Sequence, residues 1–408
     1  MTHALKTRPP RRRAQPFPIV GIGASAGGLE AFTQLLRHLA PETGMALVLV
    51  QHLDPLHASE LTRLLARTTT LPTQEVTHNL RVQPNQVYVI PPNMNLGIVK
   101  GVLKLEPRPA GRQPHHAIDF FFESLAHDQH ERAIGVVLSG TATDGTLGLE
   151  AIKAEGGITF AQDESAKYDS MPHSAIAAGC VDFVLAPEHI AQELERIAKH
   201  PYLIGTDGST ADSASDTLTL GITRRPGDAP ATVPISTDTA PALETTGART
   251  PAARGDPRAD EGFDKILLLL RNHAGVDFAL YKSNTVQRRI ARRMLLSKHD
   301  LPGYIKFLRG NKVEIATLFS DLLISVTSFF RNPEAFNVLK RVVFPELLKR
   351  RSATPIRVWV LGCSTGQEAY SVSMAFAELV EGMPRPPMLQ IFATDLNEAL
   401  LDKARAGL

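Results

Sequence analysis

The feature that most constrains this chain is a long stretch without aromatic side chains. No Phe, Tyr or Trp lies between Tyr202 and Phe263, and the segment is rich in Thr, Ala, Pro, Asp, Ser and Gly. Such a composition cannot bury enough apolar surface to offset the entropy that ordering removes. We therefore predict a disordered linker over 201–261, with folded domains before and after it.

The remaining composition sets the class of protein. With 408 residues, of which 43% are hydrophobic, the chain can build two or three cores. The 44 Lys and Arg residues nearly balance the 42 Asp and Glu residues, which argues against a nucleic-acid binder. No apolar run reaches the roughly 18 residues of a transmembrane helix, and the 2 cysteines are too few for a disulfide framework. We expect a cytoplasmic protein without membrane insertion, whose basic residues 1–16 form a disordered tail.

Residues 17–200 alternate short apolar runs with stretches of helical periodicity. The runs are Pro18–Ile22, Met45–Val50, Val87–Ile90, Ile134–Leu138 and Ile158–Phe160, and the helical stretches include Leu29–Leu39, Ile118–Ala126 and Gly148–Ala154. Strands that are apolar on both faces and separated by helices are typical of a parallel sheet covered on both sides. We predict an α/β domain with a doubly wound, mostly parallel sheet.

The part after the linker has two different patterns. Residues 262–350 carry apolar positions at helical spacing, which predicts a small all-α domain. From 351 to 408 the pattern is strand, glycine turn, helix and strand, which predicts an incomplete Rossmann-like α/β domain. Because a single unit of this kind lacks the other strands of its sheet, we expect the natural protein to continue past Leu408.

A glycine-rich turn follows the first predicted strand and supports two interpretations. Residues 21–26 fit the G-x-G-x-x-A form of a dinucleotide-binding turn. Residues 23–27 also fit G-x-S-x-G, in which small neighbours present the hydroxyl of Ser25 above the sheet. A dinucleotide site needs a carboxylate at the end of the second strand, but that strand ends in Gln51 and His52. The serine interpretation is therefore favoured, and a nicotinamide-dependent enzyme is the weaker alternative.

Two further side chains follow the carboxyl ends of predicted strands. His52 follows the second strand and Asp144 follows the strand at 134–138, so both can meet Ser25 at one edge of the sheet. Together they form a candidate Ser-His-Asp triad, with the backbone N–H groups after Ser25 as oxyanion donors. The alternatives are a capping or solvated loop histidine, and an aspartate that caps the helix directly after it. Asp54 and His57 lack a third ligand at convincing spacing, so we predict no metal site.

Four motifs in this part occur in the order of a known family. They are Ile22-Gly-Ala-Ser-Ala-Gly-Gly28, Gln51-His-Leu-Asp-Pro-Leu56, Leu138-Ser-Gly-Thr-Ala-Thr-Asp-Gly145, and Ala161-Gln-Asp-Glu-Ser165 followed by Met171-Pro. Over about Pro18 to Lys199 the chain resembles the CheB-type chemoreceptor methylesterase domain. The resemblance implies a catalytic triad of Ser25, His52 and Asp144. It also implies hydrolysis of glutamate methyl esters on chemoreceptor signalling helices, often with deamidation of glutamines.

The chain departs from that family at two positions beside the triad. Ala26 follows the nucleophile where the family usually has threonine, and Thr141 stands where it usually has an oxyanion methionine. The resemblance makes both residues candidates for the oxyanion and substrate-lining positions. No receiver domain precedes the esterase motifs, so we do not expect control by aspartyl phosphorylation within this chain.

A second glycine turn lies between the last two predicted strands. Residues 362–368 read Gly-Cys-Ser-Thr-Gly-Gln-Glu, and Asp395 ends the strand that begins near Met388. Glycines allow a ligand to approach the backbone closely, and a carboxylate at a neighbouring strand end suits ribose hydroxyls. No lysine follows the glycines, so the turn is not a P-loop. Its spacing indicates a nucleotide or nucleoside without saying which.

The helical part carries a cluster of arginines. Arg288 and Arg292, and likewise Arg289 and Arg293, are spaced i,i+4. Such a cluster is either a solvated surface or a patch that binds a glutamate-rich helix, because Arg pairs with carboxylates bidentately. Farther along, Arg331 is expected to point into a cleft between the helical and nucleoside-binding domains.

The second half also resembles a known family, over about Phe263 to Leu408. The motifs are Gly275-Val-Asp-Phe278, Tyr281-Lys282, the arginine cluster, Thr327-Ser-Phe-Phe-Arg331 and Gly362-Cys-Ser-Thr-Gly-Gln-Glu368. They are similar to those of the CheR-type chemoreceptor methyltransferase, which implies methylation of receptor glutamates with S-adenosylmethionine. By motif, the acceptor would bind at Arg288, Arg289, Arg292, Arg293, Thr327 and Arg331. The cofactor would bind at Gly362, Ser364, Gly366, Glu368 and Asp395.

These resemblances predict a bifunctional chemosensory protein. Its partners would be the cytoplasmic signalling helices of methyl-accepting chemoreceptors. The esterase half would need no cofactor, and the transferase half would use S-adenosylmethionine. Because the family's later strands do not follow, we expect this chain to bind the cofactor weakly and methylation to need the full-length protein. A non-catalytic scaffold of a chemosensory array, with a degenerate transferase half, is the alternative.

Overall fold

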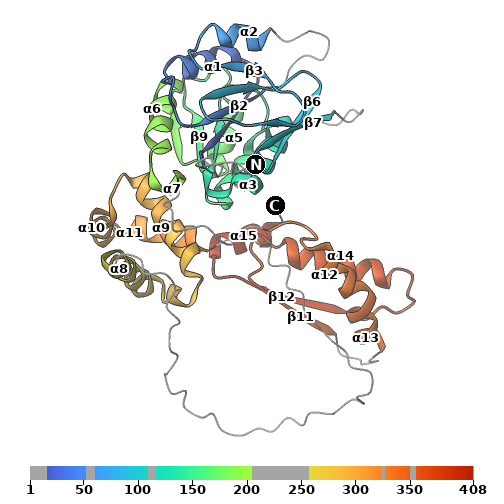
Figure 1. Cartoon of the computed structure of the whole chain (residues 1–408). Helices are drawn as coiled ribbons and strands as arrows, with labels where there is room; N and C mark the ends of the chain where they lie inside the picture. The colour runs from blue at the N-terminus through green and yellow to red at the C-terminus, as the bar shows by residue number, and fades with distance from the viewer. Residues whose placement is uncertain are drawn as a thin grey trace, which may run out of the picture.

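The structure is a computed structural model that describes residues 16–51, 60–108, 116–204, 257–323, 327–349 and 355–407 (Figure 1). The basic tail before residue 16 and residues 205–256 of the predicted linker lie outside these ranges. The described residues form a first α/β unit (16–204), a helical unit (257–323) and a second α/β unit (327–407). Among them, no helix is both long and apolar enough to cross a bilayer.

A sheet of seven parallel strands forms the centre of the first α/β unit. Its order is β10-β9-β8-β1-β2-β5-β3. The strands are β1 (Ile19–Ala24), β2 (Ala46–Gln51), β3 (Thr73–Glu75), β5 (Gln86–Val89), β8 (Ala133–Val137), β9 (Ile158–Gln162) and β10 (Phe183–Leu185). Every residue of β1, β8 and β9 is buried, as their apolar sequences predict. The predicted doubly wound parallel sheet is confirmed.

Helices cover both faces of this sheet. They are α1 (Gly28–Arg37), α2 (Leu61–Ala66), α3 (Ala117–Gln129), α4 (Thr146–Ala154), α5 (Ser170–Ala177) and α6 (Pro187–Ala198), with the short α7 (Pro201–Ile204) after them. On one face Val20 and Ile22 pack against α1, α2 and α6. On the other, Ile19 and Val48 pack against α3, α4 and α5. Alternate residues of one strand therefore enter two separate cores.

A small antiparallel sheet adds to the second of these cores. It contains β4 (Leu80–Arg81), β6 (Met94–Val99) and β7 (Val102–Pro107) in the order β4-β7-β6. Leu96, Ile98 and Leu103 are its buried apolar side chains and join the core around α3. This sheet was not predicted from the sequence, because polar residues interrupt its apolar positions.

The helical unit has its own core. It contains α8 (Pro257–Ala274), α9 (Ser283–Ser297), α10 (Leu301–Gly310) and α11 (Lys312–Leu322). Ile266, Ile290, Tyr304 and Leu318 are buried together at its centre. The helix α8 begins inside the stretch assigned to the linker, as does α7 at the other end. The end at α7 is held by packing, because Leu203 is buried in the core around α6.

The second α/β unit pairs β11 (Ile356–Leu361) with β12 (Leu389–Thr394) in parallel. Its helices are α12 (Pro333–Val338), α13 (Phe344–Lys349), α14 (Gln367–Val380) and α15 (Glu398–Ala406). Residues 333–349, predicted to belong to the all-α domain, lie in this unit instead. Phe336 and Phe344 pack with Val372 and Phe376 of α14, so α12 and α13 belong to the second α/β unit.

Candidate functional sites at two strand ends

Ser25 lies where β1 ends, between the ends of its two neighbouring strands. Ala24 pairs with Gln51 of β2, and the Ser25 N–H donates to the Ser139 carbonyl, just past β8, at 3.0 Å. From β1 the chain continues to β2 on one side, and it fills the other side only later with β8. Parallel α/β sheets bind ligands at such a reversal of strand order, outside the carboxyl ends of the strands. The half-buried Ser25 therefore occupies the expected position for a ligand site.

Contacts from both neighbouring strands hold the turn around Ser25. Gly27 has φ 77°, and a Cβ there would lie 2.6 Å from Ser139 Oγ, so only glycine fits. The Ser139 hydroxyl donates to the Ala26 carbonyl at 2.9 Å. From β2, the Gln51 side-chain amide donates to the Ser25 carbonyl at 3.3 Å. The turn is thus fixed on both sides before any substrate binds.

Asp144 lies in the loop after β8 and binds the start of a helix other than the expected one. Its two carboxylate oxygens accept the backbone N–H groups of Ile118 at 3.0 Å and Asp119 at 2.9 Å, in the first turn of α3. The start of α4 is bound instead by Asp119, whose Oδ1 accepts from Gly145 at 2.9 Å and Gly148 at 2.8 Å. Asp144 therefore caps α3, and Asp119 of α3 caps α4. The two bonds that Asp144 accepts fix its carboxylate at the strand end.

These aspartates form a buried acidic pair that the sequence analysis missed. Burial, and then the charge of Asp144, raise the pKa of Asp119 from 3.8 to about 6. The half-exposed His116 lies with Nδ1 3.6 Å from Asp119 and 3.7 Å from Asp144. These three residues could hold a metal ion by distance alone. The carboxylates already accept four backbone N–H groups, which accounts for their burial without a metal.

The structure places the other predicted residues of this site only in part. His52, Asp54 and His57 lie outside the described residues. Thr141 is exposed in the loop after β8, and Ala26 is half-buried in the turn after Ser25. Whether these residues act in catalysis stays a prediction.

Met171 is a neighbour of the site that the sequence analysis recorded only as part of a motif. Its backbone N–H donates to the Gly140 carbonyl at 3.1 Å. A Cβ on Gly140 would lie 2.1 Å from Met171 Sδ and 3.1 Å from the Ser25 Cβ. Gly140 is therefore packed between Met171 and Ser25, and a side chain there would push one of them away.

The glycines that suggested a dinucleotide site have a packing role. A Cβ on Gly21 would lie 2.8 Å from the Phe122 ring, and one on Gly23 would lie 2.4 Å from Ile118. Both neighbours belong to α3, which crosses β1 at this point. The glycines let this helix approach the strand, and that accounts for them without a pyrophosphate.

The second site repeats this arrangement at the ends of β11 and β12. Leu361 pairs with Thr394, so the glycine turn and Asp395 lie side by side. Asp395 accepts the Ser364 N–H at 2.8 Å and the Asn397 N–H at 2.8 Å. Gly366 has φ 94° and starts α14, whose first turn carries the exposed Glu368. The predicted cofactor residues of this unit therefore gather at one edge of the strand pair.

The open glycine backbone and the carboxylates at this edge fit a nucleoside ligand. A Cβ on Gly362 would meet no atom within 4 Å, so the backbone there is open to a ligand. Glu368 offers an exposed carboxylate, and Asp395 has a second lone pair on each oxygen for ribose hydroxyls. Ser364 is buried, and its φ of 50° turns the backbone towards Asp395.

Thr327 and Arg331 lie on the segment that leads into α12. The Phe330 N–H donates to Ser371 Oγ of α14 at 2.9 Å, which attaches this segment to the second α/β unit. Phe330 also packs against Phe336, as a core residue would. Thr327 is half-buried and Arg331 is exposed. Their role in binding an acceptor stays a prediction.

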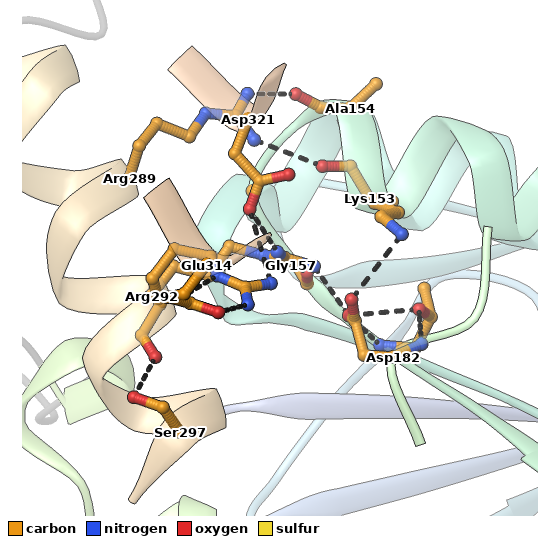
Figure 2. A network of polar contacts seen from close by, with 12 residues as sticks. Lys153, Ala154, Gly157, Asp182, Arg289, Arg292, Ser297, Glu314 and Asp321 are labelled. Carbon is orange, nitrogen blue, oxygen red and sulfur yellow. Dashed lines mark hydrogen bonds and ion pairs between the residues drawn. The ribbon is translucent and has the colours of Figure 1, made fainter. Parts of the chain in front are cut away.

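The four arginines of α9 are not equivalent, and Figure 2 shows two of them, Arg289 and Arg292. Arg288 is exposed. Arg293 makes a bidentate ion pair with Glu314 inside the helical unit. Arg289 and Arg292 instead contact the first α/β unit, at the backbone carbonyls of Lys153 and Gly157. The i,i+4 spacing did not reveal this division, because it depends on partners far away in the sequence.

Three family models match consecutive parts of the chain. The model for CheB methylesterase matches residues 20–194. The all-alpha domain of CheR methyltransferase matches 261–323, and its S-adenosylmethionine-binding domain matches 325–408. The boundary between the last two agrees with the assignment of α12 and α13 to the second α/β unit. The match to the S-adenosylmethionine-binding domain supports S-adenosylmethionine as the cofactor of the transferase half.

Similar proteins match either the first unit or most of the chain. A 104.1 kDa protein of Rhodobacter capsulatus is 35% identical over 348 residues, 84% of this chain and 34% of that protein. Protein-glutamate methylesterase/protein-glutamine glutaminase 2 of Burkholderia lata is 40% identical over 189 residues, 46% of this chain and 55% of that protein. A Leptospira interrogans protein is 34% identical over 185 residues, 44% of this chain and 95% of that protein.

The chain thus spans only about a third of the Rhodobacter protein and about half of the Burkholderia protein. The Leptospira protein is covered almost completely, and the long match to the Rhodobacter protein extends well past the first unit. This chain therefore belongs to the CheB methylesterase family over residues 20–194, and it continues into the two domains of the CheR methyltransferase family.

Proposed function

We propose that the first α/β unit is a serine hydrolase that removes methyl groups from glutamate methyl esters on chemoreceptor signalling helices. Ser25 is the nucleophile, His52 the general base and Asp144 the residue that orients the imidazole and stabilises its charged form. The observation that carries this proposal is the position of Ser25 at the reversal of strand order, beside the loop with Asp144. The family match over residues 20–194 supports it.

The reaction needs only groups of this chain and water. His52 accepts the Ser25 hydroxyl proton as Oγ attacks the ester carbonyl carbon, and the proton then passes to the methoxy oxygen, which leaves as methanol. Water attacks the acyl-enzyme with His52 again as base, and this step releases the glutamate carboxylate and restores Ser25. The backbone N–H groups of Ala26 and Gly27, next to the start of α1, are the proposed oxyanion donors.

The same site supports two extensions. The Burkholderia relative carries the double name of methylesterase and glutamine glutaminase, so we include deamidation of receptor glutamines, with ammonia as the leaving group. The proposal also places the protein in the cytoplasm. The free and buried thiols of Cys180 and Cys363 agree with a reducing compartment.

For the second half we propose glutamate O-methylation. S-adenosylmethionine would supply the methyl group, held by the glycine turn from Gly362 to Gly366 with Ser364, Glu368 and Asp395. Thr327, Arg331 and the arginines of α9 would bind the acceptor helix. The side-by-side placement of the glycine turn and Asp395 supports this assignment.

Substitution of the nucleophile tests the esterase directly. In Ser25→Ala, methanol release from a methylated receptor signalling fragment should fall by at least about 10³-fold, because the attacking hydroxyl is gone. Thr70→Ala is the matched control, since Thr70 carries an exposed hydroxyl in the same unit and precedes β3, at the amino ends of the strands. Turnover in Ser25→Ala close to that of the control would refute the nucleophile assignment.

A further inference from the structure

The arginines that would bind an acceptor are engaged in this structure by the first α/β unit. Arg292 is 1% exposed, and its guanidinium lies 2.5 Å from Asp182 Oδ2 and 3.4 Å from Asp321 (Figure 2). Its Nε donates to the Gly157 carbonyl at 3.1 Å. Arg289 donates to the carbonyls of Lys153, at 3.2 Å, and Ala154. The partners other than Asp321 all belong to the first α/β unit.

Charge and burial explain why this contact is specific. A buried guanidinium without a carboxylate is strongly unfavourable, so the helical unit can cover Arg292 only where an acid meets it. Burial lowers the pKa of Arg292, but the nearby Asp182 and Asp321 outweigh that effect and raise it overall. Asp182 is held in place by the Thr159 N–H at 3.1 Å and the Thr159 hydroxyl at 3.0 Å.

Apolar and exposed polar contacts surround the buried ion pair. Leu295 of α9 is buried in the core that contains Leu203, and Leu296 packs against the same core. At the edge, the Lys298 ammonium lies 3.3 Å from Glu193 of α6. We call the five residues of α9 and its end that make these contacts the docking surface. They are Arg289, Arg292, Leu295, Leu296 and Lys298.

The docking surface lies at the edge of the sheet opposite to the esterase site. Gly157 directly precedes β9, so its contact with Arg292 marks the amino ends of the parallel strands. Ser25 and Asp144 follow β1 and β8, at the carboxyl ends. Docking therefore covers arginines of the helical unit and leaves the edge with Ser25 free of the helical unit.

We propose that the first α/β unit is the resident partner of the docking surface, and that a glutamate-rich acceptor helix must displace it to reach Arg289 and Arg292. This inference rests on the proposed methylation of acceptor glutamates. Asp182 and a glutamate of the acceptor both offer a carboxylate to the Arg292 guanidinium, so only one of the two can bind it at a time. The apparent affinity for the acceptor is then the intrinsic affinity multiplied by the undocked fraction.

Opening of the contact can be measured in the full chain without any ligand. Spin labels on Glu164→Cys and Lys312→Cys, both exposed, report the distance between the two units. Lys298→Glu places a second carboxylate opposite Glu193, and the repulsion should broaden the distribution of distances between the two labels. Lys349→Glu is the control, because Lys349 is also exposed but pairs with Glu346 inside α13. Asp182→Asn, which removes the charge that Arg292 needs, should open the contact further.

The second measurement uses an alanine-based helical peptide with glutamates at successive i,i+4 positions, and its glutamine counterpart. Lys298→Glu and Asp182→Asn should each bind the glutamate peptide at least about threefold more tightly than the wild type and Lys349→Glu. For Lys298→Glu the local charge change alone would weaken binding, so tighter binding must come from undocking. Unchanged distances in both variants, or opened distances with unchanged peptide affinity, would overturn the proposal.

The esterase assay separates this proposal from the proposed function. Methanol release should be unchanged in Lys298→Glu, because the docking surface lies away from Ser25. Absence of methanol release from the wild-type chain would refute the esterase alone. The distance and peptide measurements would still decide the docking.

Discussion

The two α/β units place the same features at neighbouring strand ends, but they bury them differently. Each has a glycine turn into a helix and an aspartate that accepts two backbone N–H groups. In the first unit the strands at the site are buried almost throughout, and Asp144 is 2% exposed. In the second, Trp359 and Leu361 of β11 are 66% and 67% exposed, and Asp395 is half-buried.

This difference shows that the local sequence determines the conformation of each turn, whereas the neighbouring strands determine how firmly the turn is held. Both turns have left-handed glycines and similar helix starts, because these depend on a few consecutive residues. The first turn is also held by Ser139 and Gln51 from the neighbouring strands. We infer that the first site is rigid before it binds substrate, whereas fewer contacts from neighbouring strands hold the second in this chain.

Matched glycine substitutions give the largest test of this comparison. Gly27→Ala combines the strain of a left-handed residue with a contact to Ser139, and should lower the free energy of unfolding of the first unit by about 2–5 kcal/mol. Gly362 has φ 68° but open space around it. Gly362→Ala should therefore lower the free energy of unfolding of the second unit by only about 1–2 kcal/mol. Hydrogen exchange of β1 amides reports the first unit, and fluorescence of Trp359, the only tryptophan, reports the second. Equal costs in the two units would contradict the comparison.

A smaller effect should come from the acidic pair of the first unit. The pKa of Asp119 is raised from 3.8 to about 6 in the folded state, so the unfolded chain loses this proton first. The stability that neutral Asp119 provides is therefore present below about pH 4 and is lost as the pH rises through about 6. In the wild type, the rise in pH over this range should lower the free energy of unfolding by on the order of 1–3 kcal/mol. Asp119→Asn should abolish this decrease, because asparagine does not ionise.

Hydrogen exchange of β1 and β8 amides between pH 4 and pH 8 measures this difference. Asparagine keeps an oxygen for the Gly145 and Gly148 N–H groups, so the helix start stays bound. Glu164→Gln, at an exposed carboxylate, is the control and should leave the pH profile of wild type unchanged. A profile for Asp119→Asn that matches wild type would show that Asp119 is ionised throughout.

The sequence was sufficient to predict the parallel sheet of the first unit, because its strands are apolar on both faces. Val20 and Ile19 face opposite cores, so both had to be apolar. The hairpin of β6 and β7 was missed, since only one of its faces is buried and polar residues interrupt it. The assignment of Phe336 and Phe344 to the all-α domain was wrong because helical periodicity does not reveal which core a helix joins.

The candidate sites were predictable where they depend on strand ends. Ser25, Asp144 and Asp395 each follow a strand that the sequence revealed, and parallel strands bring such positions to one edge. The cap that Asp144 makes on α3 was not predictable, because Ile118 lies 26 residues away and the contact needs the folded sheet. The burial of Arg292 depends on Asp182, 110 residues away, and no spacing rule links the two.

Reaction with a fluorophosphonate tests the central claim most directly, because the probe labels a serine only when a neighbouring base activates its hydroxyl. Mass analysis of the labelled full chain should place one adduct on the peptide that contains Ser25. Labelling should be lost in Ser25→Ala and strongly reduced when His52 is replaced by Ala. A wild-type chain that stays unlabelled at Ser25 would contradict the account and favour a non-catalytic scaffold.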